Sequence, residues 1–395
     1  LGSRLVAGHG PWLPHFLETD RIRMSSRFSI RRLRRPVTTG RSSVTGLLFL
    51  AIATARVPGI AAAQSPPPSP EEFLGYPAGG EFTSVRGIES YAAALAAASS
   101  RVSLLRYGAT PEGRPLLLLV IGRTGVLEDY EPDLARLRQL TDPALSEERA
   151  RAVARETRAV VWLTYGIHGD ESSSSEAALW TAWDLATGRD GLDALLDSLI
   201  VVIDPVANPD GRDRYVNWYR SVRGAEPNPE VSSAEHMQPW PGGRFNHFLF
   251  DLNRDWIWAS QSETRARIAQ FDRWSPAVHV DFHEMGHESS YFFFPAAAPV
   301  SPLYPESTAR WAERFGRANA REFDRRRWLY FTAEQFDLFY PGYGDSWPSL
   351  VGSIGMTYEQ AGGATSSRGA HDAANGGGGE DRAAGGPGAI PLNAE

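Results

Sequence analysis

The sequence contains no cysteine and no lysine among its 395 residues. Without cysteine there are no disulfide bonds and no cysteine-ligated zinc site, so only histidine and carboxylate side chains are available to hold a metal ion. Without lysine, all 40 basic residues are arginine, which we interpret as compositional bias rather than function. The net charge is −7, although residues 1–63 hold ten arginines against Glu18 and Asp20. The rest of the chain is therefore acidic, which argues against nucleic acid as a partner.

Residues 1–63 predict a leader that includes a signal peptide, with Met24 as its natural start. An arginine-rich stretch precedes the apolar run Val44–Ala55, and the small residues Ala61–Ala63 follow it as a cleavage site. The run is short for a membrane span, so an uncleaved anchor is the weaker alternative. We expect a secreted or periplasmic protein with no stable membrane insertion after cleavage.

Composition divides the rest of the chain into three parts. Residues 64–80 begin with QSPPPSP and predict a proline-rich linker. Residues 81–363 hold the strand and helix patterns and predict the catalytic domain. Residues 364–395 are rich in glycine and alanine and have no apolar face, so we expect a low-complexity, disordered tail.

Strand and helix patterns alternate along residues 81–363. The predicted strands are Ser103–Tyr107, Leu116–Ile121, Val160–Tyr165, Leu199–Asp204, Ala277–Phe282, Tyr291–Phe294 and Ile354–Glu359, the first two as edge strands joined by a turn. The predicted helices are Tyr91–Ala98, Ser172–Ala186, Gln261–Trp274 and Pro305–Phe323. This alternation predicts an α/β fold with a mixed, mostly parallel central sheet and helices on both faces. Ligands bind beyond the carboxyl ends of such strands, where His168, Asn208, His283 and Glu359 lie.

Two of these strand ends predict a metal site. In VVWLTYGIHGDE an apolar strand breaks at Gly166 and is followed by His168 and Glu171, whose spacing lets both side chains face one ion. Taken alone, H-x-x-E is as often a solvated surface. In VHVDFHEMG, however, His283 directly follows another strand and supplies a third ligand, with Asp281 on the same face. Two histidines and a glutamate, with water in the open position, suit one Zn²⁺ per chain.

An alternative metal motif overlaps this one. Residues 283–287 spell H-E-x-x-H, in which two histidines one helical turn apart bind zinc in zincin endopeptidases. That motif requires a helix, whereas an apolar strand runs into His283 and Gly286 would lie in mid-helix at a cost of about 1 kcal/mol. We therefore expect His287 to lie in a loop or behind the ligands.

Other polar residues are candidates for binding substrate. Arg220 and Arg223 lie one helical turn apart in WYRSVR, although a single arginine is more often a solvated surface charge. Asn253 and Arg254 are adjacent in DLNRDW and offer an amide and a guanidinium to a carboxylate. Glu359 ends the strand in MTYEQ, where it can act as general base beside a metal-bound water.

In this order the motifs resemble those of the M14 family of zinc carboxypeptidases. The similarity runs from Glu81 to Gly363 and comprises GATPEGRP, HGDE, NPDG, the R-x-x-R pair, the DLNRDW box, the strand-end DFH and the late strand-end glutamate. The resemblance implies zinc on His168, Glu171 and His283. It also implies the family's fold and its reaction, the hydrolysis of the C-terminal bond of a peptide or protein with a free C-terminus.

The resemblance further assigns roles to the remaining candidates. It implies that Glu359 is the general base and acid, and that Arg223, supported by Arg220, polarises the scissile carbonyl. It implies that Asn253 and Arg254 bind the terminal carboxylate of the substrate.

The family also closes a mobile tyrosine over its substrate, for which Tyr343 and Tyr340 are both candidates. Asp170 departs from the digestive members, which carry arginine at that position, so the subsites for extended peptide differ. A zinc amidase or deacylase, or a peptidoglycan peptidase, is the alternative function on the same scaffold. A binding module without chemistry is disfavoured, because it would not need Glu359.

Overall fold

The computed structural model describes residues 66–125, 130–228, 230, 232–286 and 289–362. The predicted leader and the predicted tail lie outside these residues. Within the part described, no helix is both long enough and apolar enough to cross a membrane.

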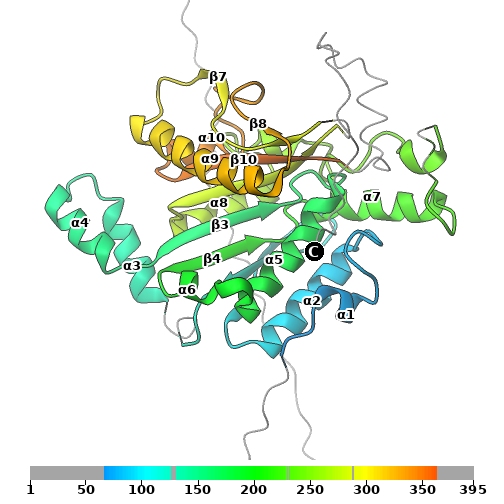
Figure 1. Ribbon diagram of the computed structural model, residues 1–395, viewed down its shortest axis with the longest axis horizontal. Coiled ribbons are helices and arrows are strands. Elements are labelled where there is room, and N and C mark those ends of the chain that lie inside the picture. Colours follow the sequence, from blue (N-terminus) through cyan, green and yellow to red (C-terminus); the bar gives the residue numbers. More distant parts are fainter. Residues whose placement is uncertain (1–65, 126–129, 229, 231, 287–288, 363–395) are drawn as a thin grey trace, which may run out of the picture. The chain divides into compact units, whose positions relative to one another are not determined.

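An eight-stranded sheet forms the centre of the described region (Figure 1). Its strand order is β1 (Val102–Ala109), β2 (Pro115–Ile121), β4 (Leu199–Asp204), β3 (Ala159–Tyr165), β5 (Val278–Met285), β10 (Ile354–Ala361), β6 (Tyr291–Phe292) and β8 (Tyr330–Phe331). A separate pair is formed by β7 (Ala297–Val300) and β9 (Asp337–Leu338). The four strands β4, β3, β5 and β10 are mutually parallel. The pairs β1–β2, β2–β4 and β10–β6 are antiparallel, and β6 pairs parallel with β8. The predicted mixed, mostly parallel sheet is confirmed.

Two strand predictions need correction. β2 was expected at an edge, but it lies between β1 and β4, and its fully buried residues explain that position. β5 was expected to end at Phe282, but it continues to Met285 because its pairing with β10 extends that far.

Helices cover both faces of the sheet. They are α1 (Pro70–Leu74), α2 (Val85–Ala98), α3 (Glu131–Leu140), α4 (Glu147–Arg155), α5 (Ser172–Thr187), α6 (Asp193–Leu196), α7 (Pro209–Val222), α8 (Ser262–Trp274), α9 (Glu306–Arg326) and α10 (Ser346–Leu350). In Figure 1, α2, α5 and α9 lie in front of the sheet and α8 lies behind it. Helix α2 begins six residues before its predicted start because Ser84 caps it.

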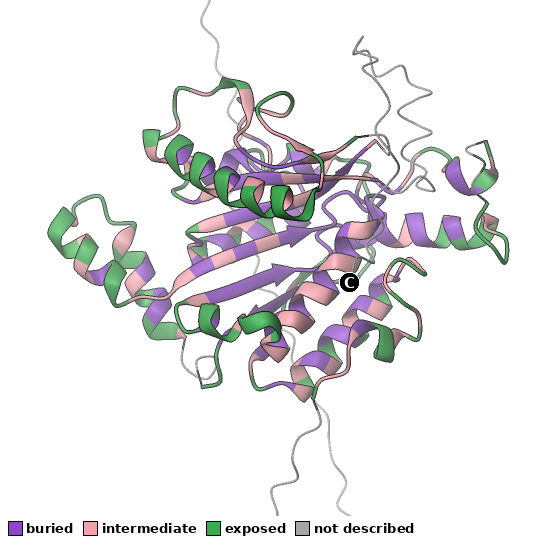
Figure 2. Cartoon of the chain, in the orientation of Figure 1, coloured by how far each residue is buried: buried purple, intermediate pink, exposed green. Residues whose placement is uncertain are grey.

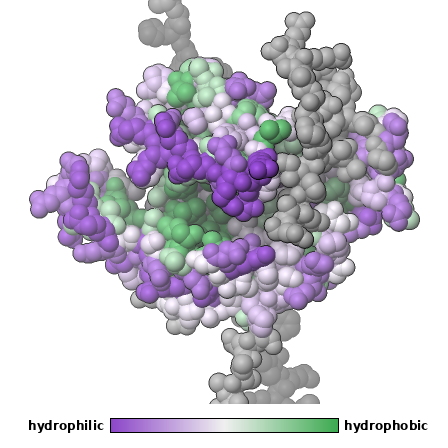
Figure 3. Space-filling model, in the orientation of Figure 1, coloured by the Kyte–Doolittle hydropathy of each residue, from purple (hydrophilic) through white to green (hydrophobic). Residues whose placement is uncertain are grey.

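The alternation of β3 residues shows how the two faces are built. Val160 and Trp162 are fully buried and pack with Phe271 and Trp274 of α8 in one core. On the other face, Val161 and Leu163 are only half buried, as Figure 2 shows by its pink bands on the strand. Figure 3 shows apolar surface in a hollow between α5 and α9 on this face.

The predicted linker differs from the structure. From residue 66 onward it packs on the domain, because the carbonyls of Pro67 and Pro68 accept hydrogen bonds from Trp183 and Tyr91 at 3.1 Å. Ser69 then forms a capping box that starts α1. The described part of residues 64–80 is therefore part of the globular unit.

Candidate metal centre

The end of β3 carries two of the three predicted metal ligands. The strand stops at Tyr165, and Gly166 turns the chain with a φ of 63°, where a Cβ would lie 2.6 Å from Ser175 Oγ. His168 follows in the loop, and Glu171 is the N-cap residue of α5. Both side chains thus lie at the junction of a buried strand and a helix, because only glycine fits the turn between them and the strand.

Sheet register brings two further residues to the same edge. Parallel pairing of β3 with β5 sets Tyr165 beside Phe282, so His283 comes one residue beyond the end of β3. Pairing of β5 with β10 sets Glu359 beside His283. Three strands therefore contribute His168, His283 and Glu359 at one carboxyl edge, as predicted for a parallel sheet.

The three predicted ligands converge. His168 Nδ1 lies 2.5 Å from Glu171 Oε1, and His283 Nδ1 lies 2.9 Å from Glu171 Oε2. One donor atom from each residue lies within 4.8 Å of the others, and all three residues are buried. Two imidazole nitrogens and one carboxylate oxygen, without cysteine, fit the donor set of a zinc site that keeps an open coordination position.

Carboxylates lie behind both imidazole rings. His168 Nε2 lies 3.0 Å from Asp251 Oδ1, so this ring can donate its Nε2–H outward and present Nδ1 to an ion, which is the usual arrangement of metal-binding histidine. His283 Nε2 lies 3.0 Å from Asp281 Oδ2 in an ion-pair contact, and its hydrogen-bond partner is the side-chain amide of Asn253. Without an ion, burial lowers the pKa of His283, but Asp281 and Glu171 outweigh it and hold that pKa well above its usual value. A proton therefore competes with a metal ion for this ring.

Arg244, which the sequence analysis did not select, contacts the same centre. Its Nη1 lies 3.3 Å from His168 Nδ1 and 3.7 Å from Glu171 Oε1, and its Nη2 donates to Asp251 Oδ2 at 2.8 Å. The preceding residue, Gly243, accepts a hydrogen bond from the N–H of Gly169 at 3.0 Å. The glycine pair before Arg244 was the available signal, because glycine permits such a close approach of two loops.

Arg220 and Arg223 are placed elsewhere. Arg223 forms an ion pair with Glu81, and Arg220 donates to the carbonyl of Phe82 at 3.1 Å. Helix α7 has 14 residues, so at 1.5 Å per residue its last turn lies about 20 Å from its start beside the metal loop. Among the described residues, neither arginine therefore contacts the three predicted metal ligands.

Asn253 and Arg254 lie beside the centre in a short 3-10 helix. Asn253 is buried, with Nδ2 3.1 Å from His283 Nε2 and Oδ1 accepting from the N–H of Gly344 at 2.7 Å. The side chain of Arg254 is 46% exposed. Arg254 is therefore the member of this pair that solvent reaches, with Nη1 donating to the Asn253 carbonyl at 3.0 Å and lying 3.8 Å from Asp251 Oδ2.

Both candidate tyrosines pack around Arg254. The Arg254 guanidinium lies 4.5 Å from the centre of the Tyr343 ring, and the Tyr340 hydroxyl donates to the Arg254 carbonyl at 2.9 Å. A cavity of about 420 Å³ adjoins them and is lined by Phe250, Asp251, Arg254, Asp255, Trp258, Ser260 and Tyr340. Asp170, the departure noted in the sequence, accepts from Gln238 Nε2 at 2.7 Å.

The H-E-x-x-H alternative conflicts with the local backbone. His283 to Met285 belong to β5, so His283 is not part of a helix and the geometry of that motif does not form. His287 lies outside the described residues.

A second group of possible metal ligands, Glu112, Asp210 and His247, lies elsewhere on the described surface. Arg114 Nη1 already donates to Glu112 Oε2 at 2.5 Å and to Asp210 Oδ1 at 2.7 Å. Glu112 and His247 are exposed, whereas His168, Glu171 and His283 are all buried, so the His168 group is the better candidate.

The comparison with family models gives the family of the chain. The model described as zinc carboxypeptidase, peptidase family M14, matches residues 88–293, which include all three predicted metal ligands. The chain belongs to the zinc carboxypeptidase family. The predicted resemblance is confirmed, and Glu359 and Tyr343 lie beyond the matched segment.

Individual relatives of the family match more weakly. Carboxypeptidase 2 of Trichophyton tonsurans is 28% identical over 124 residues, which are 31% of this chain and 18% of that protein. A metallo-carboxypeptidase from Burkholderia cenocepacia aligns with 73% of this chain and 68% of its own, at 18% identity and a TM-score of 0.46. Thrombin activatable fibrinolysis inhibitor aligns with 70% of this chain over 66% of its own length, at 17% identity and a TM-score of 0.47. The match thus spans less than a fifth of the length of the Trichophyton relative.

Proposed function

We propose that this protein is a zinc metallocarboxypeptidase, which hydrolyses the C-terminal peptide bond of peptides or proteins. The observation that carries the proposal is the convergence of His168, Glu171 and His283 donor atoms within 4.8 Å, beside a half-exposed arginine. When bound, zinc would supply Lewis-acid activation of a water molecule and of the scissile carbonyl. The family membership and the donor set support one ion per chain.

The chain's own residues perform the remaining steps of the proposed reaction. Glu359 accepts the proton of the attacking water and returns it to the leaving amine, which is the role of a general base and acid. Arg244 donates to the carbonyl oxygen as negative charge develops there. We assign this role to Arg244 in place of Arg223, because Arg244 contacts His168 and Arg223 pairs with Glu81.

The terminal carboxylate of the substrate would bind the Arg254 guanidinium, with Asn253 holding the adjoining backbone through Gly344. Tyr343 stacks on that guanidinium and is our candidate for closing over the bound residue, with Tyr340 as the alternative. The residue that is released would contact the aromatic lining of the adjoining cavity, Phe250, Trp258 and Tyr340.

The carboxylates in this cavity are already engaged. Asp251 pairs with His168 and Arg244, and Asp255 accepts from Ser260 and from the N–H of Gln261. The cavity therefore favours an aromatic or apolar terminal residue over lysine or arginine.

A pair of peptides that differ only at the C-terminus tests the proposal. A peptide ending in free phenylalanine should lose that residue in a zinc-dependent reaction, and its C-terminal amide should react about 10- to 150-fold more slowly in kcat/KM. This is the value of a charge-assisted hydrogen bond of about 1.5–3 kcal/mol. Arg254→Ala should show the same loss on the free acid and little further loss on the amide. Equal cleavage of both peptides, or internal cleavage, would replace a carboxypeptidase with an amidase or an endopeptidase.

We also propose export, with residues 1–63 removed as a leader. N-terminal sequencing of the protein recovered from an exporting host should find a new terminus just after Ala63. A mature chain that retains residues 1–63 would contradict this.

A further inference from the structure

Three polar residues follow the residues of the metal centre closely in the sequence. Ser173 comes two residues after Glu171, Glu284 directly follows His283, and Gln360 directly follows Glu359. Their backbones belong to α5, β5 and β10, the elements that carry Glu171, His283 and Glu359.

These three side chains meet. Glu284 Oε1 accepts from the N–H of Ser173 at 2.7 Å and also from the Ser173 hydroxyl. The amide of Gln360 donates to Ser173 Oγ, and Gln360 lies beside Glu284 in the register of the two strands. The Ser173 hydroxyl is therefore a donor to the carboxylate and an acceptor from the amide at once, so the three groups form one directed chain of hydrogen bonds.

The backbone of Glu284 extends the connection to the metal centre. Its N–H donates to Glu171 Oε2 at 3.1 Å, the oxygen that also faces His283 Nδ1. Glu284 is 1% exposed, so its carboxylate depends on protein hydrogen-bond donors for solvation. The first turn of α5 provides them, because the free N–H groups and the dipole of a helix N-terminus favour a negative charge there.

We infer that Ser173, Glu284 and Gln360 are positioning residues, which fix the distance of Glu359 from the metal ligands. The inference rests on the proposed function, because it takes Glu359 as the general base. Without the chain of hydrogen bonds, β10 remains paired to β5 through the backbone, but nothing in this cluster then ties its end to α5. Glu359 would shift relative to Glu171, while the ligands keep their own contacts. A shift of about 1 Å at a reacting group can cost on the order of 100-fold in rate.

Ser173→Ala and Gln360→Ala test the inference in the zinc-loaded, full-length enzyme. Each should lower kcat about 10- to 100-fold with little change in KM or in zinc content by elemental analysis, since neither touches the substrate or the ion. Ser173→Thr keeps both the N–H and the hydroxyl and should recover most of the lost kcat. The double variant should be no slower than the slower single variant, because both break the same chain.

Thr187→Ala is the matched control. It also removes a hydroxyl from α5, but that hydroxyl bonds only carbonyls of its own helix, Trp183 and Asp184. It should keep wild-type kcat. If Ser173→Ala fails to fold, Gln360→Ala alone decides, because its side chain is only half buried.

Several results would overturn the inference. These are a kcat within two-fold of wild type in Gln360→Ala, multiplied losses in the double variant, or losses that Ser173→Thr does not recover. Failure of the proposed function is separate, because wild type would then release no C-terminal residue from the free-acid peptide.

Discussion

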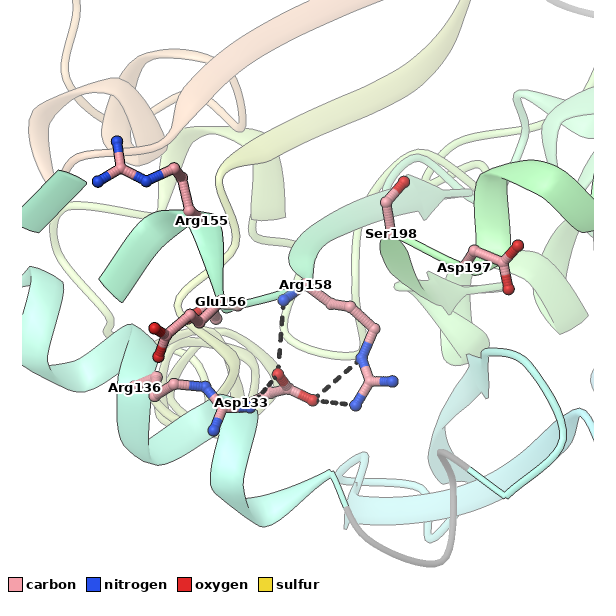
Figure 4. Close-up of a pocket in the computed structure, with 8 residues that line it drawn as sticks. Asp133, Arg136, Arg155, Glu156, Arg158, Asp197 and Ser198 are labelled. Atoms are coloured by element: carbon pink, nitrogen blue, oxygen red, sulfur yellow. Dashed lines mark hydrogen bonds and ion pairs between the residues drawn. The ribbon is translucent and has the colours of Figure 1, made fainter. Parts of the chain in front are cut away.

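The two ends of strand β3 hold charged residues in opposite arrangements. At its amino end lies a cavity of about 350 Å³, where Asp133 accepts from Arg136 through one oxygen and pairs with Arg158 through the other (Figure 4). At its carboxyl end, Glu171 lies between two imidazole rings whose Nδ1 atoms face the same point. The amino end is a completed ion pair, whereas the carboxyl end gathers two imidazoles and a carboxylate, which is the donor set of a zinc site, with Arg244 Nη1 3.7 Å from Glu171 Oε1.

Burial has opposite outcomes for carboxylates at the two ends. Burial acts to raise the pKa of Asp133, but hydrogen bonds from Arg158 and Arg136 outweigh it and lower that pKa. Near His283, burial raises the pKa of Asp345 to about 6 with help from the charge of Asp281, although hydrogen bonds from the hydroxyls of Ser346 and Thr357 and the charge of His283 act to lower it. Ion pairing at the amino end thus stabilises the charged form of Asp133. Burial at the carboxyl end destabilises the charged form of Asp345, and such perturbed carboxyl groups cluster at functional sites.

The largest expected effect is on zinc content, which a substitution at the carboxyl end of β3 should change and one at the amino end should not. His168→Ala should lose zinc and all metal-dependent turnover, because two ligands hold the ion poorly. Asp133→Ala should retain one zinc per chain and normal kcat, with only lower stability. Elemental analysis and peptide assays of both variants provide the measurement, and zinc retained by His168→Ala would move the metal elsewhere.

The next effect concerns Glu359. Glu359→Gln keeps the shape of the side chain but cannot accept a proton, so kcat should fall about 10²- to 10⁴-fold while zinc content stays at one per chain. Steady-state kinetics at saturating peptide measure it. A variant within a few-fold of wild type would remove Glu359 from the mechanism.

Arg244 and Arg223 are the two candidates for polarising the scissile carbonyl at the carboxyl end, and each serves as the control for the other. Arg244→Ala should lower kcat about 10²- to 10³-fold, as expected for loss of a donor to a developing oxyanion. Arg223→Ala should lie within two-fold of wild type, because its partner is Glu81. The reverse result would restore the role that the sequence assigned to Arg223.

The smallest effect concerns how the free energy of unfolding depends on pH, which should have opposite signs for Asp345 and Asp133. Urea unfolding of the metal-free protein measures it. The raised pKa of Asp345 stabilises the fold fully below about pH 3.9, and this contribution is lost as pH rises through about 6. Above pH 6, Asp345→Asn should therefore be more stable than wild type by up to about 3 kcal/mol, since two pKa units are worth that much.

Asp133→Asn should show the opposite sign. The lowered pKa of Asp133 stabilises the fold above about pH 3.9 and is lost as pH falls through the folded value. The variant should lose about 1.5–3 kcal/mol at neutral pH, and the deficit should shrink in acid. If both variants change in the same direction at pH 7.5, the contrast between the two ends fails.

Much of the site was predictable because it depends on local sequence. The apolar run before Gly166 predicts a buried strand, and a strand followed by H-x-x-E places His168 and Glu171 within a few residues of its end. Parallel strands end at one edge, so His283 and Glu359 could be assigned to that edge without knowing the contacts. The extent of β5 was not predictable, since pairing with β10 rather than composition sets its end.

The sequence by itself determined the fold class and the family and predicted three candidate metal ligands, because strand periodicity and short spacings between polar residues are encoded in neighbouring residues. Only the tertiary structure decided which arginine reaches those ligands. Helix α7 carries Arg223 about 20 Å away from its first turn, whereas contact between Gly243 and Gly169 holds Arg244 against His168. Both arginines lie in plausible motifs, but the position of a long side chain depends on how distant loops pack, and no local pattern records that packing.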